Sequence, residues 1–210
     1  MLYIYFCLLS IPVVIEAVNI SYHHGFVSSP KSRALLCQEH INKNCGDVQY
    51  EPQSVEGPKG FPLYGPMDGK IASAGVRRFR QLDEYDTENN SSRWNIQHIK
   101  FISTNETHVQ QTFTWEFTAR HSTTVFKFYL SNQNYTTADL LTRSVLNTNP
   151  FCEKDLMGSK PNRTISIPCF IRIDDLIPFT KTAGVILSTW DIADTTNAFY
   201  QVIDFIATIA

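Results

Sequence analysis

Apolar and polar residues alternate in the second half of the chain. Aromatic side chains occupy every second position within residues 113–118, and this period of two predicts a half-buried β-strand. Polar residues 120–124 then predict a turn. Alternation returns at residues 126–130, which predicts that this stretch is the hairpin partner of the first strand.

Two later stretches also have strand character. Residues 185–190 form a short apolar run of the buried-strand type, and residues 198–209 are rich in aromatic and β-branched side chains. Repeated short strands with turn signals between them predict an all-β fold, an antiparallel sandwich.

One region breaks this pattern. Residues 45–80 carry repeated Pro and Gly without alternation, which predicts a long irregular insertion between strands. Insertions of this length commonly serve function. Residues 83–92 are polar and predict a surface loop.

The chain opens with an apolar run at residues 1–14. A bilayer needs ~20 residues to be spanned, so this run is too short for a membrane anchor. It ends close to the small residue Ala17, as secretory signals do. We therefore expect residues 1–17 to be a signal peptide and the protein to be secreted. A buried N-terminal strand is the alternative.

Cysteine usage agrees with secretion. Cys7 lies within the signal, and an even number of cysteines in the remaining secreted domain predicts two disulfides. Three pairings are possible, of which Cys37–Cys45 and Cys152–Cys169 are the simplest. A metal site of four thiolates is the alternative, but the spacings lack the C-x-x-C pairs that zinc prefers.

Composition and net charge limit the classes of partner that we expect. The 210 residues suit one domain or two very small ones, and 43% of them are hydrophobic, enough for a full core. The net charge of -2 gives no electrostatic reason to expect nucleic acid or an anionic membrane as partner. Six sequons suggest a glycoprotein that passes through a secretory pathway. They begin at Asn19, Asn89, Asn90, Asn105, Asn134 and Asn162.

Histidines are the first candidates for chemistry, and none has a helical metal-binding spacing. His121 follows a predicted strand, where a histidine is more often a hydrogen-bonded structural residue than a ligand. His24, taken alone, does not stand out. The full set is His23, His24, His40, His98, His108 and His121.

Longer blocks carry more information. Residues 24–33 (HGFVSSPKSR), 45–57 (CGDVQYEPQSVEG), 68–74 (DGKIASA), 114–124 (TWEFTARHSTT) and 190–204 (WDIADTTNAFYQVID) resemble, in this order, the bacterial-type lytic polysaccharide monooxygenases. Within that family the blocks are most similar to the single-domain, chitin-active members, and fusolin-like proteins of insect viruses are related. The resemblance covers one domain, residues 24–210.

The resemblance implies a fibronectin-III-like or immunoglobulin-like sandwich, with the insertion at residues 45–80 as a helical loop region on the substrate face. It also implies one copper ion in a histidine brace, held by the α-amine and side chain of His24 and by His121. Imidazole and amine nitrogens suit copper, which stands high in the divalent affinity order. Phe199 and Ala119 would occupy the two axial sides of the copper site, and Glu56 would position the oxygen species.

The implied reaction is the oxidative cleavage of crystalline chitin at C1, leaving aldonic acid ends. It needs an external electron donor and O2 or H2O2 as co-substrate. The implied substrate surface is flat and belongs to a monomer. Its residues map to Tyr50, Glu51, Glu56, Thr118, His121, Asp194 and Asn197. Without the resemblance, Phe199 would be core packing, Glu56 a solvated charge, and Asp194 and Asn197 turn residues.

One difference from the family pattern, the residue that precedes His24, keeps a second hypothesis open. The brace requires cleavage before His24, but His23 precedes it, and signal peptidase prefers small residues before the cut. Cleavage after Ala17 leaves Val18 at the N-terminus and moves the α-amine away from His24. The alternatives are cleavage of residues 1–23, later trimming, or a non-catalytic chitin-binding protein on the same fold. A third reading is a structural or toxic glycoprotein acting on chitinous insect linings.

Overall fold

The computed structural model describes residues 24–85 and 93–210. The strands within these ranges are β1 (Gly25–Ser29), β2 (Glu56–Pro58), β3 (Gln97–Ser103), β4 (His108–Phe117), β5 (Thr123–Leu130), β6 (Cys152–Asp155), β7 (Thr164–Arg172), β8 (Gly184–Ile192) and β9 (Asn197–Ile209). The helices are α1 (Arg33–Gln38) and α2 (Ile173–Leu176), with 3-10 turns η1 (Gly46–Gln49), η2 (Pro52–Ser54), η3 (Arg77–Asp83), η4 (Arg143–Val145) and η5 (Ile177–Thr180).

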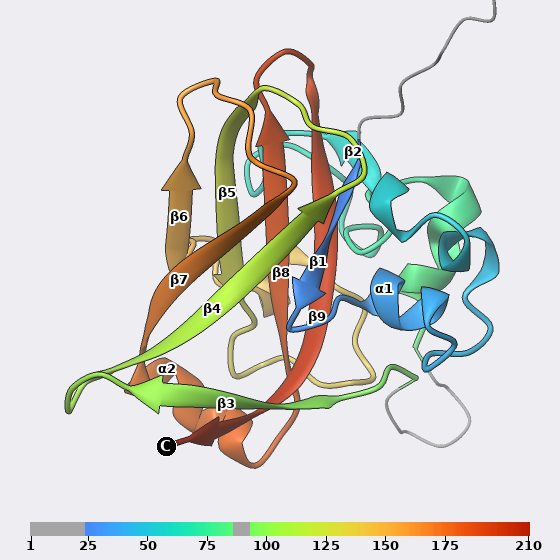
Figure 1. The fold of residues 1–210 in the computed structure, drawn as a ribbon. Coiled ribbons are helices and arrows are strands. Elements are labelled where there is room, and N and C mark those ends of the chain that lie inside the picture. Colours follow the sequence, from blue (N-terminus) through green and yellow to red (C-terminus); the bar gives the residue numbers. More distant parts are fainter. Residues whose placement is uncertain (1–23, 86–92) are drawn as a thin grey trace, which may run out of the picture.

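The strands form two facing layers (Figure 1). In one layer, β4 lies between β1 and β7, antiparallel to both. In the other, β9, β8, β5 and β6 follow one another, also antiparallel, and the short β2 pairs with the start of β9. The buried aromatic faces of both layers meet in one apolar core. The predicted all-β sandwich is thereby confirmed.

The hairpin predicted from residues 113–130 is wrong. β4 pairs with β1, β3 and β7, whereas β5 pairs with β6 and β8. Phe113 of β4 and Phe128 of β5 face each other across the core, with ring centroids 4.6 Å apart. Alternation marks one face of each strand as buried, but it does not say whether the two buried faces lie side by side or opposite. Residues 118–122 therefore cross between layers.

Strand β3 joins the two layers at one corner. Its first part, from Gln97 to Phe101, runs parallel to β9, and its last residues pair antiparallel with β4. Among the described strand pairs, β3 with β9 is the parallel one, and the others are antiparallel. The chain end is fixed at this corner, since Ala210 donates a hydrogen bond to the Phe101 carbonyl and accepts one from the Ser103 amide.

Strand β8 is buried along its whole length, as the short apolar run at residues 185–190 predicts. Ile186 and Trp190 point into the sandwich core, while Val185 and Leu187 contact a second apolar cluster. That cluster is built largely from α1 and the 45–80 region, which lie beside β9 in Figure 1. The insertion contains the short helical turns η1, η2 and η3. The expectation of a helical and irregular region is therefore confirmed.

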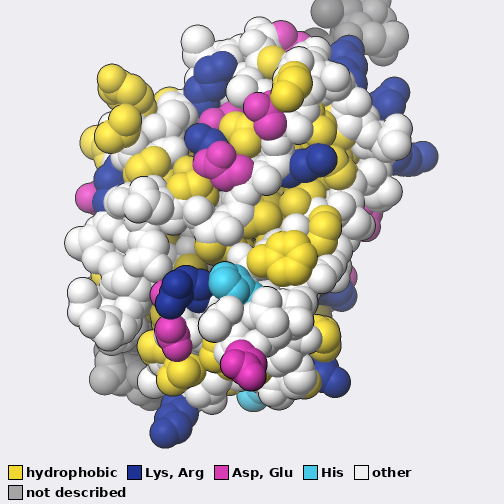
Figure 2. All heavy atoms as spheres, turned by 90° about the vertical axis from the view of Figure 1, so that its left-hand side faces the viewer, with side chains coloured by type: hydrophobic (Ala, Val, Ile, Leu, Met, Phe, Trp, Pro, Cys, Tyr) yellow, Lys and Arg dark blue, Asp and Glu magenta, His cyan; other side chains and the backbone are white. Residues whose placement is uncertain are grey.

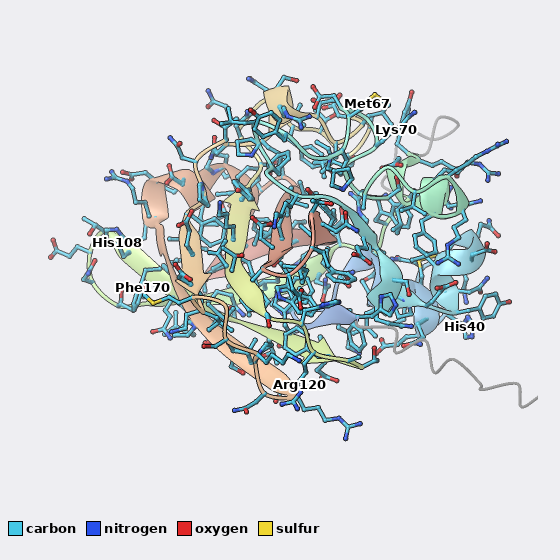
Figure 3. All side chains as sticks on the ribbon, turned by 90° about the horizontal axis from the view of Figure 1, so that it is seen from above. His40, Met67, Lys70, His108, Arg120 and Phe170 are labelled. Carbon is cyan, nitrogen blue, oxygen red and sulfur yellow. A yellow bond between two sulfur atoms is a disulfide. The ribbon has the colours of Figure 1, made fainter. Side chains whose placement is uncertain are left out.

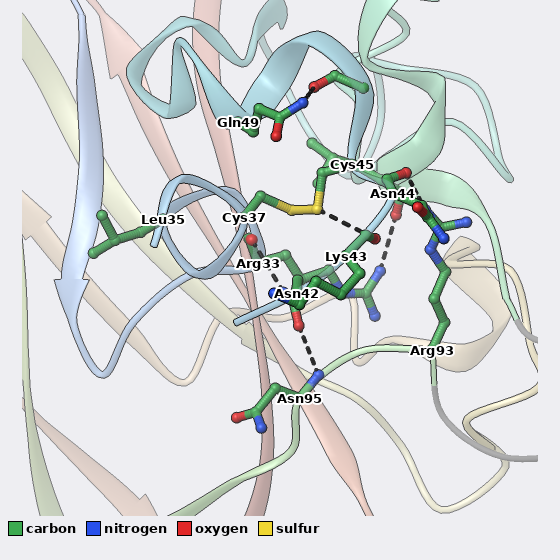
Figure 4. The surroundings of a disulfide bond; sticks show 12 residues. Arg33, Leu35, Cys37, Asn42, Lys43, Asn44, Cys45, Gln49, Arg93 and Asn95 are labelled. Atoms are coloured by element: carbon green, nitrogen blue, oxygen red, sulfur yellow. Dashed lines mark hydrogen bonds between the residues drawn. A yellow bond between two sulfur atoms is a disulfide. The ribbon is translucent and has the colours of Figure 1, made fainter. Parts of the chain in front are cut away.

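Both predicted disulfides are present. Cys37–Cys45 joins the end of α1 to η1, with Asn42 donating to the Arg33 carbonyl close by (Figure 4). Cys152–Cys169 joins β6 to β7 and so links the two layers.

Some expectations lie outside the described residues. These are the signal peptide, the residues preceding His24, and the sequons at Asn19, Asn89 and Asn90. Within the described ranges, no helix has both the length and the apolar character needed to cross a membrane.

Candidate functional site

Residue His24 is placed by the end of strand β4. Its backbone nitrogen donates to the Ala119 carbonyl at 3.2 Å, and its carbonyl accepts from the Thr118 and Ala119 amides at 2.9 and 3.3 Å. The Thr118 hydroxyl donates to the same carbonyl. These bonds continue the pairing of β1 with β4 by one more residue, because Gly25 is already opposite Phe117. The strand end therefore holds His24 beside two of the predicted site residues.

Residue His121 lies in the 118–122 connection that crosses between the layers. Its Nδ1 is 3.3 Å from an Asp194 carboxylate oxygen. An imidazole whose Nδ1 faces a carboxylate is oriented, and its Nε2 is then the nitrogen available to a metal. Asp194 was predicted to be a substrate residue, and the structure places it against a predicted ligand.

Residue Phe199 brings the two histidines together. Its ring meets His24 edge-on at a centroid distance of 5.7 Å and lies 6.2 Å from the ring of His121. Phe199 is fully buried and stacks on Trp190 at 4.9 Å. Trp190 in turn contacts His121 at 5.9 Å and donates from Nε1 to the Thr123 hydroxyl at 2.8 Å. Phe199 thus contacts both imidazoles, and Trp190 supports Phe199 and His121 from behind.

Residue Glu56 lies directly opposite Phe199, because β2 pairs with β9 in that register. Its carboxylate accepts a hydrogen bond from the Asn197 side chain at 2.9 Å. Glu56 and Asn197 are both half-buried. The structure therefore brings together His24, Ala119, Phe199, Glu56 and Asn197 at one end of β9.

The remaining predicted residues, Tyr50 and Glu51, lie between η1 and η2. Tyr50 is 75% exposed, as a stacking platform requires. Glu51 forms a two-pronged ion pair with Arg78, at 2.5 and 2.9 Å. This pairing leaves the Glu51 carboxylate less available to a sugar than the sequence suggested.

Sequence reasoning missed three residues that support this site. Trp190 packs against His121 and Phe199. It is the first residue of the block at residues 190–204, so its position was a usable signal. Arg78 holds Glu51. Lys59 donates from Nζ to the carbonyls of Ile192 and Thr195 and so fixes the turn that carries Asp194. Nothing in the local sequence marks Arg78 or Lys59.

The donor chemistry fits a copper ion held by nitrogen. In the described ranges no cluster of three or more His, Cys, Asp or Glu side chains could hold a metal. Two imidazoles border Phe199, and the third nitrogen would be the His24 backbone nitrogen, if the chain began there. Three nitrogen donors without a thiolate or a carboxylate cluster suit copper better than calcium or magnesium.

Three cavities of the described residues lie away from this site. Cavities of about 660, 460 and 240 Å³ are lined by described residues elsewhere, and none of these three includes a predicted site residue.

Most of the chain is similar to known proteins. Residues 24–205 match the family described as "Lytic polysaccharide mono-oxygenase, cellulose-degrading". GlcNAc-binding protein A of Shewanella oneidensis is 41% identical over 181 residues, covering 86% of this chain and 35% of that protein. AA10 family lytic polysaccharide monooxygenase C of Mycosarcoma maydis is 36% identical over 183 residues, covering 86% and 51% respectively. The chain spans about a third to a half of the length of these relatives.

Solved structures resemble the whole described domain. An AA10 monooxygenase from Photorhabdus luminescens has a TM-score of 0.76 at 36% identity, covering 89% of this chain and 100% of that one. A Bacillus amyloliquefaciens CBM33 in complex with Cu(I) has a TM-score of 0.71 at 34% identity, covering 88% and 100%.

Proposed function

Because this chain belongs to the lytic polysaccharide monooxygenase family, we propose that it is a secreted, copper-dependent enzyme that cleaves crystalline chitin with oxidation at C1. The observation that carries the proposal is the convergence of His24 and His121 on the buried ring of Phe199. The family match extends over 24–205 and so includes both histidines.

Copper, when bound, would supply the one-electron chemistry that takes electrons from an external donor and lets O2 or H2O2 act as the oxidant of the sugar. The chain's own residues hold the nitrogens in place. Asp194 orients the His121 ring through Nδ1, and the strand end fixes the backbone nitrogen of His24. Phe199 closes one side of the site to water, because its ring is fully buried beside both imidazoles. Glu56, held by Asn197, presents a carboxylate next to Phe199.

Chitin is the proposed substrate. The family description names cellulose, whereas the similar protein of Shewanella oneidensis is described as GlcNAc-binding. On this chain, exposed Tyr50 offers a ring on which a sugar can stack, and Thr118, Asp194 and Asn197 offer groups for hydrogen bonds to acetamido and hydroxyl groups.

Secretion is proposed with the enzyme. Two disulfides form in oxidising compartments, and the described sequon residues Asn105, Asn134 and Asn162 are all exposed and open to glycosylation. The expected signal peptide ends after residue 17 or residue 23. Only the second cut, or later trimming, makes the His24 nitrogen an α-amine.

One observation favours a second candidate. The cleavage pattern points to Ala17, and a chain that begins at Val18 lacks the α-amine at His24. Such a chain would be a non-catalytic chitin-binding protein on the same fold.

The test compares two forms with defined N-termini, Val18 and His24, after copper loading. The His24 form should release aldonic acid products from β-chitin when given a reductant, as read by mass spectrometry. His121→Ala should abolish these products, whereas the exposed His98→Ala, on β3, should not. The Val18 form should bind chitin without oxidising it. Inactivity of a copper-loaded His24 form would favour the binding protein, and oxidation by the Val18 form would contradict the brace.

A further inference from the structure

A second concave feature lies apart from the copper site. A cavity of about 660 Å³ is bounded by residues 69–77, by η3 and the two residues after it, and by Leu140. None of its lining residues belongs to the predicted copper or chitin surface. In the view of Figure 3, Lys70 of this cavity lies at the edge opposite Arg120, the neighbour of His121.

The cavity walls are fixed before any ligand arrives. The Gly69 amide donates to the Leu141 carbonyl at 3.0 Å, and the Gly75 amide donates to the Lys70 carbonyl at 2.8 Å. Gly69 and Gly75 both have φ of +76°, a conformation that favours glycine and sets the shape of the two turns. The volume lies within the range of about 300–1,000 Å³ that small-molecule sites occupy.

The charges around this cavity are unevenly paired. Its two acidic residues already have partners: Asp83 accepts from the Ser73 amide at 3.0 Å, and Glu84 is ion-paired with Arg93. The three basic residues of the lining, Lys70, Arg77 and Arg80, are exposed, and within the described ranges none of them is ion-paired with Asp or Glu. The lining therefore holds three basic side chains against two acidic ones, of which Glu84 is already paired with Arg93, and it carries an excess of positive charge.

The interior of the cavity is mainly apolar. Val76, Tyr85 and Leu140 contribute the apolar lining, and Leu140 lies against Gly69, where an added Cβ would be 3.3 Å from its Cδ1. An apolar, partly aromatic lining beneath a basic rim matches a molecule with an apolar body and an anionic head. Arginine is well suited to the head, because its planar guanidinium can bind a carboxylate or sulfonate with two parallel hydrogen bonds.

We propose that this cavity binds a small organic anion of the aryl carboxylate or aryl sulfonate class. The anionic head lies between Arg77 and Arg80, and the aromatic body packs on Val76, Tyr85 and Leu140. This ligand class differs from the neutral polysaccharide proposed for the other site, and no step here depends on copper.

The probe for the test is 8-anilinonaphthalene-1-sulfonate, titrated into the copper-free secreted protein and followed by fluorescence. The parent should bind one probe saturably. The double variant Arg77→Ser/Arg80→Ser should bind at least about tenfold more weakly, since two charge-assisted hydrogen-bonding groups are removed. The control Arg163→Ser/Arg172→Ser removes the same charge from exposed positions elsewhere and should bind like the parent.

A neutral probe and a variant of the apolar lining complete the test. N-phenyl-1-naphthylamine, which has a similar body without the sulfonate, should bind the parent more weakly than the anionic probe. Leu140→Asp should weaken the binding of both probes. Circular dichroism melts of every variant should match the parent, so that probe binding to unfolded protein is excluded. Equal affinity of parent and Arg77→Ser/Arg80→Ser, absence of saturable binding, or equal binding of the neutral probe would overturn the proposal.

Discussion

At the residue scale, the exposed Tyr50 can be compared with an equally exposed tyrosine outside the proposed chitin surface. Tyr50 and Tyr64 are both 75% exposed, but only Tyr50 lies in the block assigned to the chitin surface. Tyr50→Ala should release much of the protein from β-chitin, because an exposed ring that stacks on sugar loses its contact, while copper affinity stays nearly the same. Tyr64→Ala is the control and should bind chitin like the parent. Equal retention of both variants in a pull-down would rule out stacking at Tyr50.

The buried pair of Arg33 and Asp204 is the second residue-scale case. The Arg33 guanidinium donates two hydrogen bonds of 2.7 Å to the Asp204 carboxylate, and a third of 3.1 Å to the Leu82 carbonyl. Burial alone lowers the pKa of the Arg33 guanidinium, but the Asp204 carboxylate outweighs it, and the pKa lies above its ordinary value. The positive charge therefore persists inside the fold only with its partner.

Removing that partner should be costly. Asp204→Asn should lower the free energy of unfolding by about 3–5 kcal/mol, because it leaves a buried guanidinium without its counter-charge. The exposed pair of Arg172 and Asp174 gives the control, and Asp174→Asn should cost less than about 1 kcal/mol. Urea unfolding of both variants measures the difference. Similar losses for the two would mean that burial does not govern this pair.

At the scale of elements, the Cys152–Cys169 bond joins the edge strand β6 of one layer to β7 of the other. Replacing both cysteines by serine should lower the free energy of unfolding by about 3 kcal/mol, the value expected for a loop of this length. Thermal melts with and without reductant measure it. A melt of the parent that reductant does not change, with both bonds shown to be reduced, would contradict the prediction.

Strand β8 also carries a charge that the fold disfavours. Burial raises the pKa of Asp191, and Lys127 and Lys59 offset this only in part. A carboxyl whose folded pKa is raised stabilises the fold below its unfolded pKa, about 3.9, and loses that contribution as pH rises through the folded value. Asp191→Asn should therefore raise the melting temperature at pH 7, with the gain disappearing near pH 3. Exposed Asp175→Asn should show no such gain, and a loss of stability at every pH would contradict the assignment.

Patterns of side chains predicted the strands but not how they meet. The alternation at residues 113–117 and 126–130 marked the correct buried faces, yet β4 and β5 belong to opposite layers. The short apolar run at residues 185–190 predicted a fully buried strand, and β8 is covered on both of its faces. The parallel pairing of β3 with β9 joins residues more than a hundred positions apart, and no local pattern encodes it.

The candidate site depended on blocks of sequence rather than on periodicity. Phe199 lies on a strand with buried neighbours on both sides, so its residue type alone is indistinguishable from core. Its place between two histidines follows from contacts among β1, β9 and the 118–122 connection, which are distant in the chain. Likewise, the local sequence marks Asp194 only as a turn residue. Its contact with His121 is visible only in the folded structure.

At the scale of the whole molecule, the sequence carries nearly equal numbers of basic and acidic side chains. Figure 2, which views the left-hand side of Figure 1, shows hydrophobic, basic and acidic side chains interspersed over that face. This agrees with the small net charge of -2. The proposed recognition of chitin therefore relies on contact and stacking rather than on long-range attraction.

The path of β9 has a practical consequence. It begins beside Glu56 and ends thirteen residues later, where Ala210 is held by Phe101 and Ser103. At about 3.3 Å per residue, roughly 40 Å separate the two ends, and Figure 1 marks the carboxyl end on the far side from β2. A tether added after Ala210 would display the histidines outward from a bead or an electrode. A tether ahead of His24 would instead cap the nitrogen on which the proposed metal site depends.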